Sequence, residues 1–130
     1  MRSLYDGIKA LFSVRPQVAT ATVTGGGVDT QGYNSAMAVL EVGAVSGTTP
    51  TLDVKIQDSA DNITFADVAG LTFSQVTAAN NSQVLRIDGL NTPQRRRYLR
   101  AIGTIGGTTP SFALAIEVLL GRAYKEPVNP

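Results

Sequence analysis

Two similar stretches decide the fold: SGTTPTLDVKI at Ser46–Ile56 and GGTTPSFALAI at Gly106–Ile116. In both, apolar residues follow the Gly-Thr-Thr-Pro run at every second position, which is the period of a strand with one buried face. Glycine permits a tight turn, and a proline is tolerated where its missing N–H is not needed by the ladder. We therefore predict that each stretch forms a β-hairpin. The positions expected to face the core are Val54, Ile56, Leu114 and Ile116.

The pattern from Gln17 onward is that of short strands separated by turns rich in Gly, Asn, Asp and Thr. About eight strands at regular spacing are typical of a sandwich or jelly roll. We predict an all-β fold, with one β-sandwich or jelly-roll-like domain over residues 17–120. Residues 1–16 are predicted to be an N-terminal amphipathic arm, and residues 121–130 an extended C-terminal tail.

The arm contains the one helical pattern of the chain, over Ser3–Val14. Its apolar residues fall at i, i+4, i+7 and i+8, on one face of a helix, and they are Leu4, Ile8, Leu11 and Phe12. A helix this short is marginal by itself and needs a surface to lie on. We predict that the arm lies outside the domain's own core and that these four residues bind a neighbouring protein.

Residues that carry common chemistry are missing, because the chain has neither histidine nor cysteine. Gly25-Gly26-Gly27 lacks the Gly-Lys-Ser/Thr ending of a phosphate-binding loop. Asp58, Asp61, Asn62 and Asp67 do not have the spacing of a calcium loop, and such residues favour turns. We therefore expect no enzyme, no cofactor and no metal site. Apolar runs fall short of the ~20 residues that span a bilayer, so no membrane contact is expected either.

Four arginines form the main charge cluster of the sequence: Arg95, Arg96, Arg97 and Arg100. One interpretation is a charged loop and strand edge that keep the protein soluble. Another is a docking contact to an acidic protein surface, since the planar guanidinium suits carboxylates. Nucleic-acid binding is disfavoured because the net charge is only +1. The cluster is thus a second candidate protein-interaction site.

The stretches GVDTQGYNSAMAVLEVGAVSGTTPTLDVKIQDSADNITFADVAG (Gly27–Gly70) and RRYLRAIGTIGGTTPSFALAIEVLLG (Arg96–Gly121) resemble a family of small structural proteins of tailed bacteriophages and prophages. The resemblance lies in a Gly-Val-Asp-x-x-Gly-Tyr-x-Ser-Ala segment, a Gln-Asp-Ser-x-Asp-x-x-Thr-Phe turn and an Arg-Tyr-x-Arg strand. It implies a capsid cement (decoration) protein. Such a protein is a jelly-roll-like domain that binds the outside of the capsid and bridges neighbouring major capsid subunits.

The resemblance and the composition together predict a virion structural protein on the capsid exterior, made in the host cytoplasm. Its expected partners are the major capsid protein and other copies of itself. Charged residues make up 16 % of the chain, below the roughly 25 % of average domains, which favours a protein packed against others. Alternatives are a carbohydrate- or receptor-binding β-sandwich of a phage tail or fibre, and a head–tail connector component. The lack of tryptophan counts against a carbohydrate site.

Overall fold

The computed structural model describes residues 4–90 and 92–124 of the chain. This part contains one helical turn, α1 (Leu4–Gly7), followed by seven strands. The strands are β1 (Ile8–Ala19), β2 (Val23–Thr24), β3 (Val28–Asp29), β4 (Tyr33–Ser59), β5 (Ala66–Thr72), β6 (Asn81–Ile87) and β7 (Tyr98–Ala123). All of them belong to a single antiparallel sheet. The predicted all-β fold is confirmed.

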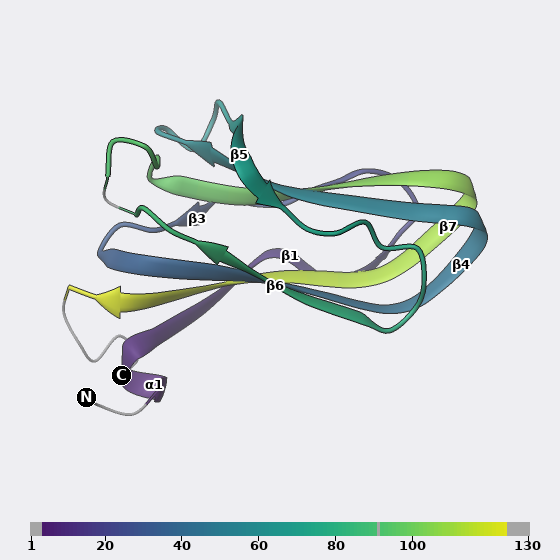
Figure 1. Cartoon of the computed structure of the whole chain (residues 1–130), viewed down its shortest axis with the longest axis horizontal. Coiled ribbons are helices and arrows are strands. Elements are labelled where there is room, and N and C mark those ends of the chain that lie inside the picture. The colour runs from purple at the N-terminus through teal and green to yellow at the C-terminus, as the bar shows by residue number, and fades with distance from the viewer. Residues whose placement is uncertain (1–3, 91, 125–130) are drawn as a thin grey trace.

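Two long strands, β4 and β7, determine the shape of the sheet. They pair along their whole length, from Tyr33↔Ala123 to Ser59↔Tyr98, and both bend in the middle. The sheet therefore folds over on itself into two layers that are joined at one end (Figure 1). The first layer has the order β6, first half of β4, second half of β7, β1. The second layer contains β5, the second half of β4 and the first half of β7, with β2 and β3 beyond it.

The prediction of two separate β-hairpins is wrong. The residues on either side of each Gly-Thr-Thr-Pro run do not pair with each other, because both flanks pair with the other long strand: Val45 with Phe112 and Leu52 with Ile105. The two runs instead pair across the bend, with Thr48 opposite Thr108. The sequence repeat is therefore the corner of a sandwich, where two adjacent strands pass together from one layer to the other.

The core lies between the two layers and is formed by alternate residues of β4 and β7. Val54, Ile56, Leu114 and Ile116 are at most 4 % exposed, so the predicted inward positions are confirmed. The largest side chains around them that are fully buried include Leu40, Leu52, Leu99, Phe112 and Leu120. Because these residues alternate along both strands, the period-2 pattern found in the sequence is the pattern that builds the core.

The helix predicted over Ser3–Val14 is wrong beyond Gly7, and Ser3 lies outside the described residues. Residues 8–19 form β1, which pairs with β7 from Ile8↔Gly121 to Ala19↔Phe112. Val14 is 1 % exposed within the core, and Leu11 packs against that core. The edge of β7 offers this segment backbone hydrogen bonds over most of its length. This tertiary pairing overrides the helical pattern, because a helix this short is marginal by itself.

The ends of the predicted domain also fall within strands. β1 continues across the boundary between residues 16 and 17, and β7 continues past residue 120 to Ala123. The remainder of the predicted tail, residues 125–130, lies outside the described residues. No helix in the described part of the chain is long and apolar enough to cross a membrane.

Ser13 holds a bulge in β1 against the rest of the domain. Its hydroxyl donates a hydrogen bond to Gly26 O and accepts one from Ala101 N, both 2.9 Å long. Gly25 N donates to Ala101 O at 2.8 Å, and a Cβ on Gly25 would lie only 2.2 Å from Ser13 Oγ. The Gly25-Gly26-Gly27 run is thus a closely packed connection, in which Gly25 is needed so that two backbones and a buried serine can approach each other.

Candidate interaction surface

The four apolar residues predicted to bind a neighbour are not on one face. Leu4 and Phe12 are 67 % and 42 % exposed, whereas Leu11 packs inward on the core. Ile8 is half-buried near the start of β1. In a strand, residues of even and odd number point to opposite sides, so Ile8 and Phe12 share the outer side and Leu11 takes the inner one. Their role in binding stays a prediction, with Phe12 placed best for it.

Most of the arginine group is bonded within its own domain. Arg95 Nε and Nη2 both donate to Asp88 O, at 3.1 and 3.0 Å. Arg97 Nε and Nη2 donate to the two carboxylate oxygens of Asp29, at 2.8 and 2.7 Å. This hydrogen-bonded pair is the main reason that the pKa of Asp29 is lowered and that of Arg97 raised.

The other two arginines differ in how firmly they are held. Arg100 donates to Gln57 Oε1 at 2.9 Å and stacks over the Phe65 ring, 4.1 Å from its centroid. The guanidinium of Arg96 makes a longer contact, 4.0 Å from Nε to an Asp58 carboxylate oxygen, and the Arg96 side chain is 53 % exposed. Docking of the arginine group on an acidic surface stays a prediction, and Arg96 is the member with its guanidinium most available for it.

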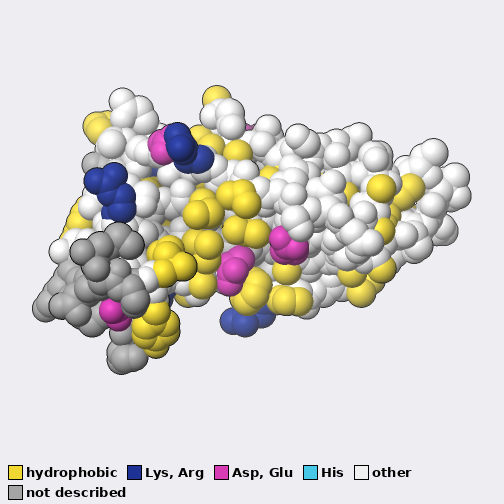
Figure 2. All heavy atoms as spheres, turned by 60° about the horizontal axis from the view of Figure 1, so that its bottom comes forward, with side chains coloured by type: hydrophobic (Ala, Val, Ile, Leu, Met, Phe, Trp, Pro, Cys, Tyr) yellow, Lys and Arg dark blue, Asp and Glu magenta, His cyan; other side chains and the backbone are white. Residues whose placement is uncertain are grey.

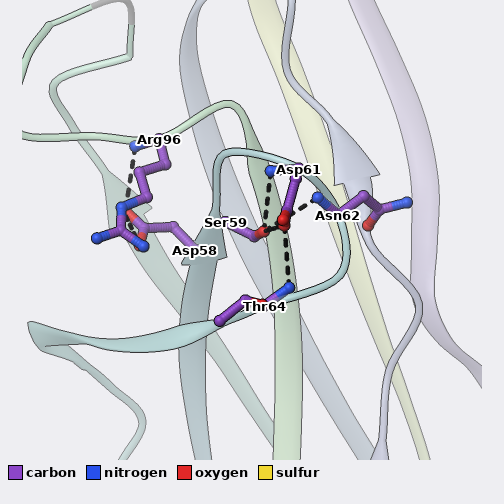
Figure 3. A network of polar contacts seen from close by, with 6 residues as sticks. All are labelled: Asp58, Ser59, Asp61, Asn62, Thr64 and Arg96. Carbon is purple, nitrogen blue, oxygen red and sulfur yellow. Dashed lines mark hydrogen bonds and ion pairs between the residues drawn. The ribbon is translucent and has the colours of Figure 1, made fainter.

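Asp58 and Asp61 hold the turn that follows β4 (Figure 3). One oxygen of Asp61 accepts hydrogen bonds from Thr64 N, Ile63 N and the Ser59 hydroxyl, at 2.8–2.9 Å. These bonds, led by the one from Thr64, lower the pKa of Asp61 to about 2. Asp58 is buried and accepts from Arg96 N at 3.1 Å, which ties this turn to the arginine segment.

The carboxylates of Asp58, Asp61 and Asp67 do not form a common site. Asp67 lies on β5, where it accepts hydrogen bonds from Lys55 Nζ at 2.9 Å and Gln57 Nε2 at 2.7 Å. Within residues 4–90 and 92–124, no three His, Cys, Asp or Glu side chains are grouped so that they could hold a metal ion. Each of these aspartates therefore has a structural contact that accounts for it.

The outer face of the first layer is an exposed apolar surface that the sequence analysis did not single out. Paired residues of neighbouring strands lie on the same side of a sheet, so the outward row through Phe12 continues through Glu117, Val39 and Val84. We call this surface the apolar face, and its apolar members are Phe12, Val18, Met37, Val39, Val84, Ala113, Ala115 and Leu119. Figure 2 shows hydrophobic side chains gathered over the middle of this side of the molecule, with acidic ones among them.

The outer face of the second layer is different in character. Its outward positions on the two long strands include Asp53, Lys55, Gln57, Arg100 and Thr104. Polar outward residues are what a sandwich normally presents to water. The two outer faces of one small domain therefore differ, and the apolar face is the exception.

A shallow hollow of about 600 Å³ lies at the end of the apolar face nearest the corner. Its small residues are Gly43, Ala113 and Ala115, and Val18 and Glu41 also line it. The hollow forms where β1 is bulged between Val14 and Gln17 and where the register of β4 on β7 shifts after Val42. Small side chains and irregular pairing together leave room for a side chain from outside.

Comparisons with known proteins add a likeness of fold. No protein-family model matches the chain, and no curated protein matches its sequence. A chain in the structure of infectious bursal disease virus Gx strain is similar, with a TM-score of 0.56 and 9 % identity. The match covers 88 % of this chain but 32 % of that one, so the chain spans about a third of the viral chain's length.

Two further solved structures have lower scores. The SPBc2 prophage-derived protein YomS has a TM-score of 0.49 and 11 % identity, over 92 % of this chain and 97 % of that one. A family two carbohydrate esterase from Cellvibrio japonicus has a TM-score of 0.35 and 12 % identity, over 91 % and 35 %. At these identities the first of the three comparisons supports a shared sandwich fold, and the two lower scores add nothing to it.

Proposed function

We propose that the chain is a virion structural protein that binds the outer surface of a bacteriophage capsid and cements neighbouring major capsid subunits. The observation that carries the proposal is the fold: a two-layer sandwich similar, over 88 % of the chain, to part of a chain in a virus structure. The phage-like motifs at Gly27–Gly70 and Arg96–Gly121 point to the same class of protein and to the finer role of cement.

A binding role without catalysis is consistent with the residues present. The chain has no histidine or cysteine, which removes the commonest general base and the thiol nucleophile. The aspartates that are closest in sequence are engaged in turns and in strand contacts. What the domain offers a partner is a surface, the apolar face, rather than an enclosed site.

Such a protein would stabilise the capsid because it binds the assembled shell and does not bind the separate subunits. A ligand that binds only the assembled state stabilises that state by mass action. A rigid domain that touches two neighbouring subunits resists their separation because both contacts must break together. The closely packed core between the two layers supplies that rigidity.

The proposal is tested with heads purified from the phage that encodes the chain, after deletion of its gene. Purified chain is added back, the heads are sedimented, and bound copies per major capsid subunit are counted by quantitative mass spectrometry. We expect saturation at a fixed ratio with many copies per head, and heads that withstand higher temperature. Saturation at a few copies per head would instead indicate a connector or tail role, and absence of binding would refute a virion role.

A further inference from the structure

We infer that the apolar face is the surface by which the chain docks on a different protein, and that this partner presents a flat apolar patch carrying basic side chains. The identification of that partner as the capsid shell rests on the proposed function, whereas the chemistry of the contact does not. The residues of this face that matter most for the contact are Phe12, Val39, Val84, Glu41 and Glu117.

Several apolar side chains of this face are exposed. Val84 is 67 % exposed and Phe12 42 %, at the two ends of one row across this face, and Val18, in a second row, is 67 % exposed. Isolated exposed apolar residues are ordinary, but a contiguous patch on one face marks an interaction site. The second layer has polar residues on its outer face, so this domain folds with a polar sheet surface exposed to water. The apolar residues of the first layer are therefore not required by the fold.

Two carboxylates lie among these apolar residues. Glu117 stands between Phe12 and Val39 in one row, and Glu41 lies one row nearer the corner. Diagonal neighbours in an antiparallel pair are about 7–8 Å apart, so the two carboxylates form one acidic spot inside an apolar patch. Arg86 lies on the same face, opposite Met37, but the ion pairs of the described residues include neither Glu41 nor Glu117. Ser82 donates a hydrogen bond to Glu41, at 2.7 Å. Burying both charges is costly unless the partner supplies cations.

The hollow of about 600 Å³ lies beside Glu41. Its apolar lining, which includes Val18 and Ala113, suits the aliphatic stem of a lysine or arginine. Glu41 is placed to meet the charged end of such a side chain. A basic residue of the partner that enters the hollow would thus satisfy both the shape and the charge of this part of the face.

A second copy of this chain fits the face poorly. In a two-fold symmetric interface, residues close to the axis meet their own copies. Glu117 lies in the central row of the apolar face, so a dimer centred on the patch would bring two such carboxylates together with Glu41 of each copy close by. Like charges opposed in a closing interface disfavour that pairing. The occupant that the face selects is a surface of opposite charge.

The test is site-specific photocross-linking in the native host, with p-benzoylphenylalanine placed at position 84 of the full chain. The control site is position 63, since Ile63 is also exposed, at 80 %, but lies in the turn after β4. We expect a cross-link from position 84 and not from position 63. Mass spectrometry should identify the captured partner as a different protein and map the cross-link to a lysine- or arginine-containing apolar segment.

A charge-reversed chain, Glu41→Lys with Glu117→Lys, should reduce that cross-link by about tenfold or more. Asp53→Lys, on the polar outer face, should leave it unchanged, and thermal melting of each variant checks that it is folded. Cross-linking only to other copies of this chain, no cross-link at position 84, or a cross-link that survives charge reversal would each overturn the inference. A partner that is not a shell protein would refute the proposed function and leave the inference standing.

Discussion

Gly47 and Gly107 each lie directly against the corner segment of the other long strand. A Cβ on Gly47 would be 2.7 Å from Thr109 O, and a Cβ on Gly107 would be 2.6 Å from Thr49 O. Both have positive φ angles, 111° and 109°, and residues other than glycine rarely adopt such angles. The two copies of Gly-Thr-Thr-Pro thus form one reciprocal contact, which joins the two layers at the bend.

Replacing either glycine by alanine should therefore destabilise the domain severely. Backbone strain and close overlap with the opposite carbonyl together should cost about 2–4 kcal/mol. Denaturant unfolding of Gly47→Ala and Gly107→Ala checks this, with Gly26→Ala as the control because a Cβ there has only a 3.9 Å contact. Midpoints equal to that of the control would show that the corner is not built in this way.

Core residues that flank the corner should matter more than its threonines. Truncation of Ile56 or Ile116 to alanine, both 0 % exposed, should cost about 2–5 kcal/mol because each leaves a cavity between the layers. Thr48→Ala and Thr108→Ala should cost far less, because both side chains are exposed. Chemical denaturation of the four variants compares them directly, and a larger effect at the threonines would contradict the register.

How much the sequence could predict is clear from these same residues. The period-2 pattern after each proline located Val54, Ile56, Leu114 and Ile116 in the core correctly, because alternation follows from strand geometry alone. Whether a Gly-Thr-Thr-Pro run closes a hairpin or bends a long strand depends on which strand lies beside it. That neighbour is distant in the sequence, so local pattern gave the wrong answer.

The apolar face does have a signal in the sequence, in the nearly continuous apolar run Ser35–Val45. An apolar run without alternation indicates a strand that is covered on both sides. Met37 and Val39 are apolar residues of that run that point outward. The helix prediction failed for a related reason, since residues at i and i+4 have the same parity and also share one side of a strand.

Ser13 should be a stability hot spot although it is a small polar residue. Ser13→Ala removes both hydrogen bonds of the hydroxyl and leaves the buried Ala101 N–H without its acceptor, which should cost about 1–3 kcal/mol. Ser82→Ala is the matched control, because Ser82 is exposed and its hydroxyl donates to Glu41, which is exposed as well. Equal unfolding free energies for the two variants would show that the β1 bulge is not held by Ser13.

Truncation should show that α1 contributes little to the stability of the domain and that β1 contributes much. A chain that begins at Ile8 should melt close to the full-length protein, since Leu4 and Tyr5 are largely exposed. A chain that begins at Arg15 loses Leu11, Ser13 and Val14 from the domain and should lose about 3 kcal/mol or more. Melting curves of both truncations provide the comparison, and unchanged stability in the shorter chain would restore the arm as a separate element.

The turn at Asp61 predicts a pH dependence with a definite sign. The folded pKa of about 2 is below the unfolded value of about 4, so the ionised carboxylate stabilises the fold fully above the unfolded pKa. That contribution is lost as the pH falls from about 4 towards about 2. The difference in unfolding midpoint between the wild type and Asp61→Ala should therefore shrink over this range. A difference that is constant with pH would contradict the assignment.

The most direct test of the central claim is a cryo-electron microscopy reconstruction of heads lacking the chain, before and after purified chain is added. We expect added density outside the shell, repeated over the lattice. Each sandwich should span neighbouring subunits with the outer face of β1, β4, β6 and β7 towards the shell. Heads that show no added density, or density at a single vertex only, would contradict it.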